Sequence, residues 1–231
     1  MQHAHTTAPT QLTESTLRAL ARSGLHQEPL DDGLHDPDRA KLGSPSDFDL
    51  NPELAAQRLK QPAPRPAAVL VPIVSRGELT VLLTQRTKDL PSHAGQIAFP
   101  GGKMEAGDNG PVATALRETQ EEIGLEARFV EPIGYLDPYL TGTGFCVFPV
   151  VALVREGFRL NPDSSEVAEV FEVPLAFLMD AQNHQTHERA WHGGMRRFHA
   201  MPFQDRYIWG VTAGIMKNMH QRLFAHDPHR C

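Results

Sequence analysis

The stretch that most constrains this chain is residues 99–125, where a glycine pair, an acidic loop and a carboxylate-rich segment follow one another. Gly101 and Gly102 come directly after a proline. Glycine permits backbone angles that other residues avoid, so a tight turn or the close approach of a ligand is expected there. Over residues 111–123 apolar side chains recur at steps of three and four, which predicts a helix. The proline at its start suits the first helical turn, and Gly124 suits its end.

Three glutamates of this predicted helix share one face. Glu118, Glu121 and Glu122 are spaced i, i+3 and i+4, and Arg117 is the only cation nearby in sequence. Like charges on one face repel one another, and a divalent cation held by carboxylate oxygens would remove that repulsion. The alternative is a merely solvated acidic face, which is the usual meaning of an isolated acidic string. The glycine pair and the acidic loop directly ahead favour the metal-binding interpretation.

Residues 102–125 resemble the Nudix box, the signature of hydrolases that cleave nucleoside diphosphates linked to another moiety. That box reads G-x5-E-x7-R-E-U-x-E-E-x-G-U, where U is aliphatic. This chain departs from it in three ways: Asp108 replaces the first glutamate, eight residues instead of seven separate it from Arg117, and Thr119 replaces the aliphatic residue. The residues that carry the resemblance are Gly102, Glu105, Asp108, Arg117, Glu118, Glu121, Glu122, Gly124 and Leu125.

The segment ahead of the box, residues 82–102, resembles the additional signature of coenzyme A pyrophosphatases within the Nudix superfamily, L-L-T-x-R-[S/A]-x3-R-x3-G-x3-F-P-G-G. Thr87 stands where serine or alanine is usual, and Pro91 falls where many members have arginine. Residues 166–175 and 207–219 resemble later elements of the same subfamily. The matching positions of the first segment are Leu82, Leu83, Thr84, Arg86, Gly95, Phe99, Pro100, Gly101 and Gly102.

The resemblance implies the fold and the domain organisation. We expect an α/β fold, the Nudix-type α/β/α sandwich with a mixed β-sheet, preceded by an N-terminal helical extension. The expected domains are a partly disordered extension over residues 1–63, a Nudix hydrolase domain over 64–226 and a tail over 227–231. Periodicity and turn residues predict the individual elements. They are helices over 12–25, 51–59 and 211–224, strands over 68–74, 79–84, 127–137 and 144–154, a polar loop over 138–143, and a hairpin around Gly193 and Gly194.

Composition excludes several classes of function. The chain has 22 Lys and Arg against 28 Asp and Glu and no basic run, which argues against a nonspecific nucleic-acid binder. No run of 18 apolar residues occurs, so no membrane span is expected. Cys146 and Cys231 lie far apart and form no metal or redox motif, which favours a reducing, cytoplasmic location. We expect a monomer or homodimer whose partner is a small-molecule substrate.

The proposed chemistry assigns roles to the box residues. A carboxylate-held Mg²⁺ or Mn²⁺ neutralises the charge of a diphosphate and lowers the pKa of a bound water. We predict Glu118, Glu121 and Glu122 as metal ligands. Glu121, Glu122 and Arg117 are the predicted catalytic residues, and the resemblance implies that Arg117 orients a box glutamate. The predicted substrate-binding residues are Arg86, whose planar fork matches phosphate, and the pair Gly101 and Gly102.

The resemblance implies hydrolysis of coenzyme A or its thioesters, giving 4′-phosphopantetheine or its acyl form and adenosine 3′,5′-bisphosphate. One alternative keeps the chemistry and changes the substrate to ADP-ribose, NADH, a dinucleoside polyphosphate or an oxidised nucleotide. Another is a Nudix-fold binding module without catalysis, which the intact glutamates disfavour. Glu166 remains open as a further ligand or base, against a solvated or structural role.

Overall fold

The computed structural model describes residues 12–30, 45–52, 62–90, 92–191 and 194–224. Its centre is an eight-stranded sheet with the path β3-β2-β1-β7-β5, to which β4, β6 and β8 add by pairing with β1, β7 and β2. The strands β1 and β7 run parallel and the other pairs are antiparallel, so the sheet is mixed. Its strands are β1 Arg65–Arg76, β2 Glu78–Arg86, β3 Ile97–Ala98, β4 Gly101–Lys103, β5 Val130–Tyr135, β6 Tyr139–Leu140, β7 Phe145–Val154 and β8 Val167–Pro174.

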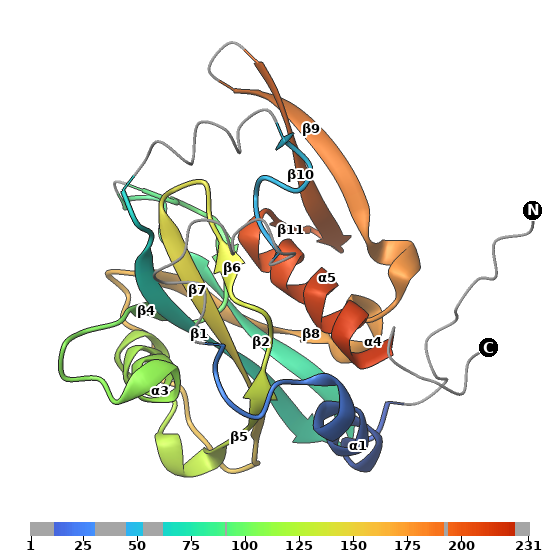
Figure 1. Ribbon diagram of the computed structural model, residues 1–231. Coiled ribbons are helices and arrows are strands. Elements are labelled where there is room, and N and C mark those ends of the chain that lie inside the picture. The colour runs from blue at the N-terminus through green and yellow to red at the C-terminus, as the bar shows by residue number, and fades with distance from the viewer. Residues whose placement is uncertain (1–11, 31–44, 53–61, 91, 192–193, 225–231) are drawn as a thin grey trace, which may run out of the picture.

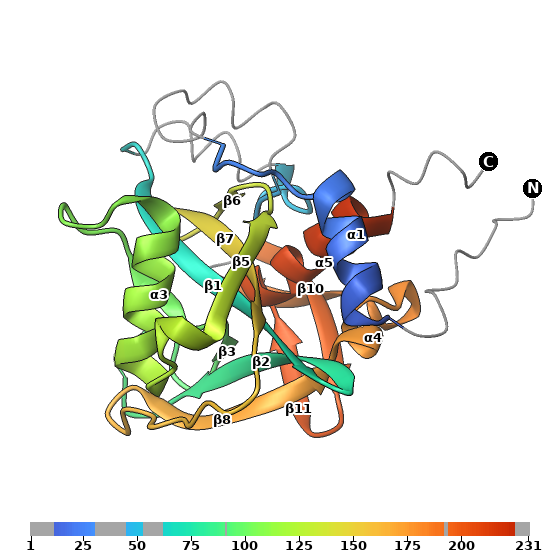
Figure 2. The same cartoon turned by 90° about the horizontal axis from the view of Figure 1, so that it is seen from below.

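A second, three-stranded sheet and the helices cover the central sheet. Helix α3 lies on one side, and α1, α5 and the second sheet lie on the other (Figures 1 and 2). This arrangement is the mixed α/β architecture with an N-terminal helix that the sequence predicts. The second sheet consists of β9 Gln185–Trp191, β10 Gly194–Phe203 and β11 Arg206–Trp209. The helices are α1 Glu14–Gly24, α3 Gly110–Ile123, η3 Ala127–Phe129, α4 Leu175–Leu178, η4 Ala181–Asn183 and α5 Val211–Phe224.

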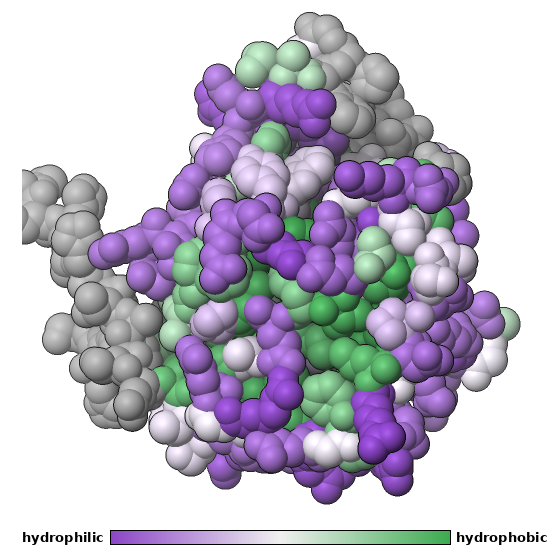
Figure 3. All heavy atoms as spheres, turned by 180° about the vertical axis from the view of Figure 1, so that it is seen from behind, coloured by the Kyte–Doolittle hydropathy of each residue, from purple (hydrophilic) through white to green (hydrophobic). Residues whose placement is uncertain are grey.

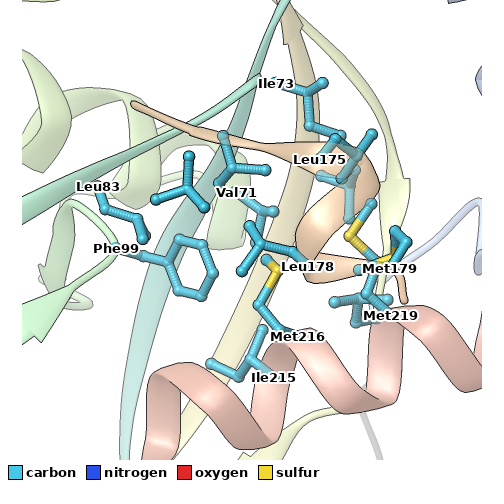
Figure 4. Packing of buried hydrophobic residues seen from close by; sticks show 14 of the residues in the cluster. Val71, Ile73, Leu83, Phe99, Leu175, Leu178, Met179, Ile215, Met216 and Met219 are labelled. Carbon is cyan, nitrogen blue, oxygen red and sulfur yellow. The ribbon is translucent and has the colours of Figure 1, made fainter. Parts of the chain in front are cut away.

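Strand β1 contributes to two hydrophobic cores because alternate side chains of a strand point to opposite faces. Leu70 belongs to the cluster beneath α3, whereas Val71 and Ile73 belong to the cluster beneath α5. Figure 4 shows the second cluster, in which Ile73 lies beside Leu175 while Met216 and Met219 extend from α5 into the same cluster. Because both of its faces are buried, the middle of this strand has a continuous apolar sequence.

Most predicted elements are confirmed. The predicted helices over 12–25 and 211–224 are α1 and α5, and the four predicted strands correspond to β1, β2, β5 and β7. The hairpin is formed by β9 and β10. The predicted helix over 51–59 lies almost wholly outside the described residues. No helix of the described part of the chain is long and apolar enough to cross a membrane.

Three predictions need correction. The glycine pair forms no tight turn, because Gly101 and Gly102 belong to strand β4, which pairs with β1. The segment over 127–137 begins with the short helix η3, and its strand starts only at Val130. Within the predicted polar loop, Tyr139 and Leu140 are buried and pair with β7 as strand β6.

Thr119, the residue that departs from the aliphatic pattern, gives the first testable prediction. Its side chain is fully buried in α3, and its hydroxyl has no hydrogen-bond partner among the described residues. A buried hydroxyl without a partner destabilises the folded state. We therefore expect Thr119→Val, which has nearly the same shape, to raise the free energy of unfolding by about 1 kcal/mol. Urea denaturation measures this, and a lower midpoint for the valine variant would show that the hydroxyl is hydrogen-bonded in solution.

Candidate active site

Strand β4 holds the C-terminal half of helix α3 in place. Pro111 lies at the start of that helix, and Gly124 ends it in the left-handed conformation with φ 71°. The backbone N–H of Gly101 on β4 donates a hydrogen bond to Oε2 of Glu122 at 3.1 Å. A helix carboxylate is thereby fixed against the backbone of the central sheet.

Gly102 leaves room for a second carboxylate. A Cβ atom at this position would lie 2.5 Å from the carboxyl carbon of Glu118 and 2.8 Å from its Oε1. The absence of a side chain therefore lets Glu118 lie directly against β4. Glu118 and Glu122, one helical turn apart, both face the glycine strand.

A methyl group at Gly102 tests this close approach. Gly102→Ala is expected to fold, because the atoms in the way belong to the end of a side chain that can rotate. It should lower kcat about tenfold, since displacing a predicted metal ligand by even 1 Å can cost this much or more. Steady-state kinetics measures the effect. Gly107→Ala is the matched control because nothing lies within 4 Å of its Cβ position. Unchanged kcat in the Gly102 variant would mean that Glu118 need not lie against β4.

Arg117 organises the acidic loop rather than facing outward. Its guanidinium donates to both carboxylate oxygens of Asp108, at 3.0 and 2.9 Å, and to the carbonyl of Lys103 at 3.1 Å. It also donates to Glu118 at 2.9 Å and to Glu121 at 3.2 Å. These hydrogen bonds hold the pKa of Asp108 well below its usual range. With so many carboxylate partners, Arg117 is placed to orient glutamates, and its role in catalysis stays a prediction.

Burial strongly perturbs the carboxyl group of Glu122. It is 8 % exposed, and desolvation raises its pKa to about 7, although the hydrogen bond from Gly101 and the charge of Arg86 act in the opposite direction. Glu166 and Glu118 raise it further through like-charge repulsion. Burial also raises the pKa of Glu118. The site thus concentrates negative charge where water solvates it poorly.

Arg86, at the end of β2, lies between two carboxylates. Its guanidinium is 3.7 Å from Oε1 of Glu122 and 3.7 Å from Oε2 of Glu166. Its Nε is buried and has no hydrogen-bond partner within the described ranges. An arginine whose guanidinium makes only long contacts to two carboxylates, one buried and one exposed, can bind an oxyanion such as phosphate.

Of the three glutamates grouped around β8, only Glu166 lies at this site. Glu169 and Glu172 point elsewhere, since Glu169 pairs with Arg206 at 2.6 Å and Glu172 pairs with Arg76. The contact between Glu166 and Arg86 joins segments far apart in sequence. Spacing alone cannot reveal it, since the sequence leaves open whether Glu166 is a ligand or base or has a solvated or structural role.

The predicted metal ligands are not equally placed. Glu118 and Glu122 lie against β4, whereas the side chain of Glu121 is 62 % exposed at the rim and bonded to Arg117. The described residues contain no group of three or more His, Cys, Asp or Glu side chains arranged to hold a metal ion. The chemistry of the donors nevertheless suits a hard divalent cation, because they are carboxylate oxygens whose charge is costly without one. The roles assigned to these residues stay predictions.

Comparison with known proteins places this site in context. The NUDIX domain family matches residues 64–192. The chain is 38 % identical over 159 residues to the uncharacterized Nudix hydrolase NudL of Photorhabdus laumondii subsp. laumondii, covering 69 % of this chain and 85 % of the relative. It is 38 % identical over 173 residues to NudL of Yersinia enterocolitica, covering 72 % and 89 %. Among solved structures, a C. elegans Ap4A hydrolase is 21 % identical with a TM-score of 0.42, covering 47 % of this chain and 80 % of the other.

Proposed function

Because this chain belongs to the Nudix family, we propose that it is a Nudix hydrolase that cleaves the diphosphate linkage of coenzyme A or its thioesters. The products are 4′-phosphopantetheine, or its acyl form, and adenosine 3′,5′-bisphosphate. Nudix hydrolases act on small nucleotide substrates and generally use divalent metals such as Mg²⁺ or Mn²⁺. The choice of coenzyme A as the substrate goes beyond what membership of the Nudix family implies.

The observation that supports coenzyme A as the substrate is the position of the signature segment, residues 82–102, in the fold. It contains the end of β2 and strands β3 and β4, so that Arg86 and the two glycines border the buried carboxylates. A sequence signature that resembles that of coenzyme A pyrophosphatases therefore coincides with the walls of the candidate site. This coincidence supports the choice of coenzyme A over other diphosphates.

We assign Glu118, Glu121 and Glu122 as the residues that would hold Mg²⁺ or Mn²⁺. When bound, such an ion supplies charge neutralisation at the diphosphate and a more acidic water. The N–H of Gly101 orients Glu122, and Arg117 orients Glu118 and Glu121. These contacts preorganise the carboxylates before the substrate arrives.

Arg86 is proposed to bind the substrate, and Glu121 is proposed to accept the proton of the attacking water. Arg86 binds phosphate oxygens through its guanidinium, leaving its long contacts to Glu122 and Glu166. The oxygen of a water molecule bonds to one phosphorus, and the bond from that phosphorus to the bridging oxygen breaks with its electron pair on the leaving phosphate. Glu121, the exposed member of the cluster, accepts the proton of the water.

Product analysis tests the proposal. The full-length protein is incubated with coenzyme A and Mg²⁺, and the products are separated by chromatography. We expect adenosine 3′,5′-bisphosphate to appear with Mg²⁺ and to be absent with a chelator. ADP-ribose, NADH and a dinucleoside polyphosphate are run in competition. A higher kcat/KM for one of these would replace coenzyme A with that substrate, and no turnover of any diphosphate would overturn the enzymatic assignment.

A further inference from the structure

Thr114 of helix α3 is a buried polar residue at a position that the Nudix box leaves unspecified. Polar side chains usually lie at the surface, as the purple residues of Figure 3 do, whereas Thr114 is fully buried. A buried hydroxyl destabilises the fold unless it is hydrogen-bonded, so its partner indicates its role. The hydroxyl of Thr114 donates to Oδ2 of Asp108 at 2.8 Å. A residue outside the signature thus contacts a carboxylate of the acidic loop.

A second acceptor lies near the same hydroxyl, but the carboxylate is the better one. Oγ1 of Thr114 is 3.3 Å from the carbonyl oxygen of Gly110, the contact that a helical threonine commonly makes with residue i−4. A hydroxyl has only one proton to donate. A charged acceptor at 2.8 Å forms a stronger hydrogen bond than a neutral one at 3.3 Å. The proton is therefore directed to Asp108 and not to the helix backbone.

Three different groups donate hydrogen bonds to Asp108. Its Oδ2 accepts from the backbone N–H of Glu105 at 2.9 Å and from the hydroxyl of Thr114. The guanidinium of Arg117 donates to both of its oxygens. Together these donors hold the pKa of Asp108 well below its usual range, and the ionised carboxylate can only accept hydrogen bonds. Of the three donors, the hydroxyl of Thr114 is the one that a substitution can remove without changing the charge or the backbone.

The guanidinium of Arg117 connects Asp108 to the glutamates of the site. Its Nε and Nη2 donate to Asp108, and Nη2 also donates to the carbonyl of Lys103 on β4. Its Nη1 donates to Glu118 at 2.9 Å and to Glu121 at 3.2 Å. Because a guanidinium is planar, holding one of its edges sets the direction of the other. The position of Asp108 therefore influences where two of the three predicted metal ligands lie.

We propose that Thr114 is a positioning residue for the predicted metal ligands. Its hydroxyl fixes Asp108, and Asp108 fixes the guanidinium of Arg117. Arg117 in turn orients Glu118 and Glu121 for a divalent cation. The proposal rests on the proposed function, since it concerns the ligands of the same site. Hydrogen bonds behind a metal ligand hold it in the orientation that the ion needs, and their loss typically lowers metal affinity or activity by about 10- to 100-fold.

Binding of Mn²⁺ to the full-length protein without substrate tests this proposal. Thr114→Val keeps the shape of the side chain and removes the hydroxyl. A titration that follows the electron paramagnetic resonance signal of free Mn²⁺ should show binding about 10-fold weaker in this variant. Thr114→Ser keeps the hydroxyl and should bind Mn²⁺ as the wild type does. If the valine variant does not fold, Thr114→Ala removes the same hydroxyl with a better helix former and should weaken binding equally.

Thr119→Val is the matched control. Thr119 lies on the same helix and is equally buried, but its hydroxyl has no hydrogen-bond partner in the described part of the chain. The same substitution there should leave the Mn²⁺ affinity unchanged. A merely structural role for the hydroxyl of Thr114 would lower the urea midpoint of Thr114→Val and leave its Mn²⁺ affinity at the wild-type value. That result would overturn the proposal, as would a wild type that binds no Mn²⁺.

A double-mutant cycle tests whether the hydroxyl acts through Asp108. In an Asp108→Asn background, Thr114→Val should weaken Mn²⁺ binding less than it does in the wild type, because the two side chains are in contact. Strictly additive losses would contradict the proposed route.

Hydrolysis of coenzyme A separates this proposal from the proposed function. If coenzyme A is hydrolysed and Thr114→Val binds Mn²⁺ as the wild type does, the function is supported and the positioning role is wrong. If coenzyme A is not hydrolysed, but Mn²⁺ binding weakens in Thr114→Val and recovers in Thr114→Ser, the positioning role is supported and the substrate is wrong.

Discussion

Glu122→Gln is expected to lower kcat by at least two orders of magnitude while the protein remains folded. Glutamine keeps an oxygen that can accept the hydrogen bond from Gly101, so the local geometry is preserved. It removes the negative charge that the proposed chemistry requires, and loss of one such interaction costs about 3 kcal/mol or more of transition-state stabilisation. Steady-state turnover of coenzyme A with Mg²⁺ measures the effect.

Glu126→Gln is the matched control for activity, because Glu126 lies beyond the end of α3 with its side chain exposed and should leave kcat unchanged. Wild-type turnover in Glu122→Gln would remove Glu122 from the catalytic machinery. The raised pKa of this carboxyl would then reflect burial alone and have no role in catalysis.

Glu122→Gln is expected to increase the stability of the protein although it lowers turnover. The pKa of Glu122 is raised from 4.5 to about 7, so the folded state binds this proton more tightly than the unfolded chain does. The free energy of unfolding of the metal-free protein therefore falls as pH rises from about 4.5 to 7. Glutamine removes that dependence. At pH 8 with a chelator, we expect Glu122→Gln to be more stable than the wild type by about 2 kcal/mol.

Urea denaturation at pH 8 and at pH 4.5 measures this difference, which should become small at the lower pH because Glu122 is then protonated in the folded state and half protonated in the unfolded chain. A wild type that is the more stable protein at pH 8 would contradict the electrostatic cost assigned to this residue. The combination of lost turnover and increased stability is what a functional carboxylate in a poorly solvated site should produce.

Gly101→Ala is expected to damage the fold itself. Gly101 has φ 148°, which side chains rarely adopt, and a Cβ there would lie 2.6 Å from Cα of Val69 and overlap the carbonyl oxygen of Ala68. Both obstacles are backbone atoms of β1, which cannot move without disturbing its pairing with β4 and β7. We expect the free energy of unfolding to fall by about 3 kcal/mol or more.

Urea denaturation measures this loss, with Gly107→Ala as the control because that glycine has open space around its Cβ position. The control should stay within about 0.5 kcal/mol of the wild type. A denaturation midpoint of Gly101→Ala equal to that of the wild type would mean that β4 can separate from β1 at little cost. Gly101 would then serve the site only through its N–H.

Local patterns were enough to predict several elements of this protein. The three- and four-residue spacing of apolar side chains, with Pro111 at the start and Gly124 at the end, predicts α3 to within one residue. Continuous apolar runs predict β1 and β7, since strands buried on both faces carry no polar alternation. These predictions succeed because helix caps and side-chain periodicity depend only on near neighbours in the chain.

The glycine pair shows where local information ends. Its sequence is compatible with a turn or with a close approach, and the choice depends on β1, which lies about thirty residues earlier in the chain. Strand β8 was missed for a similar reason. Its glutamates at 169 and 172 look solvated in sequence, yet they pair with Arg206 and Arg76 from distant strands.

Residue types at fixed spacings were enough to predict the family, the main elements of the fold, and the helix that carries Glu118, Glu121 and Glu122. The folded arrangement alone shows that Glu122 is buried and Glu121 exposed, and that Arg86 lies between Glu122 and Glu166. The physical reason is that burial, pKa and charge pairing depend on which distant segments pack together.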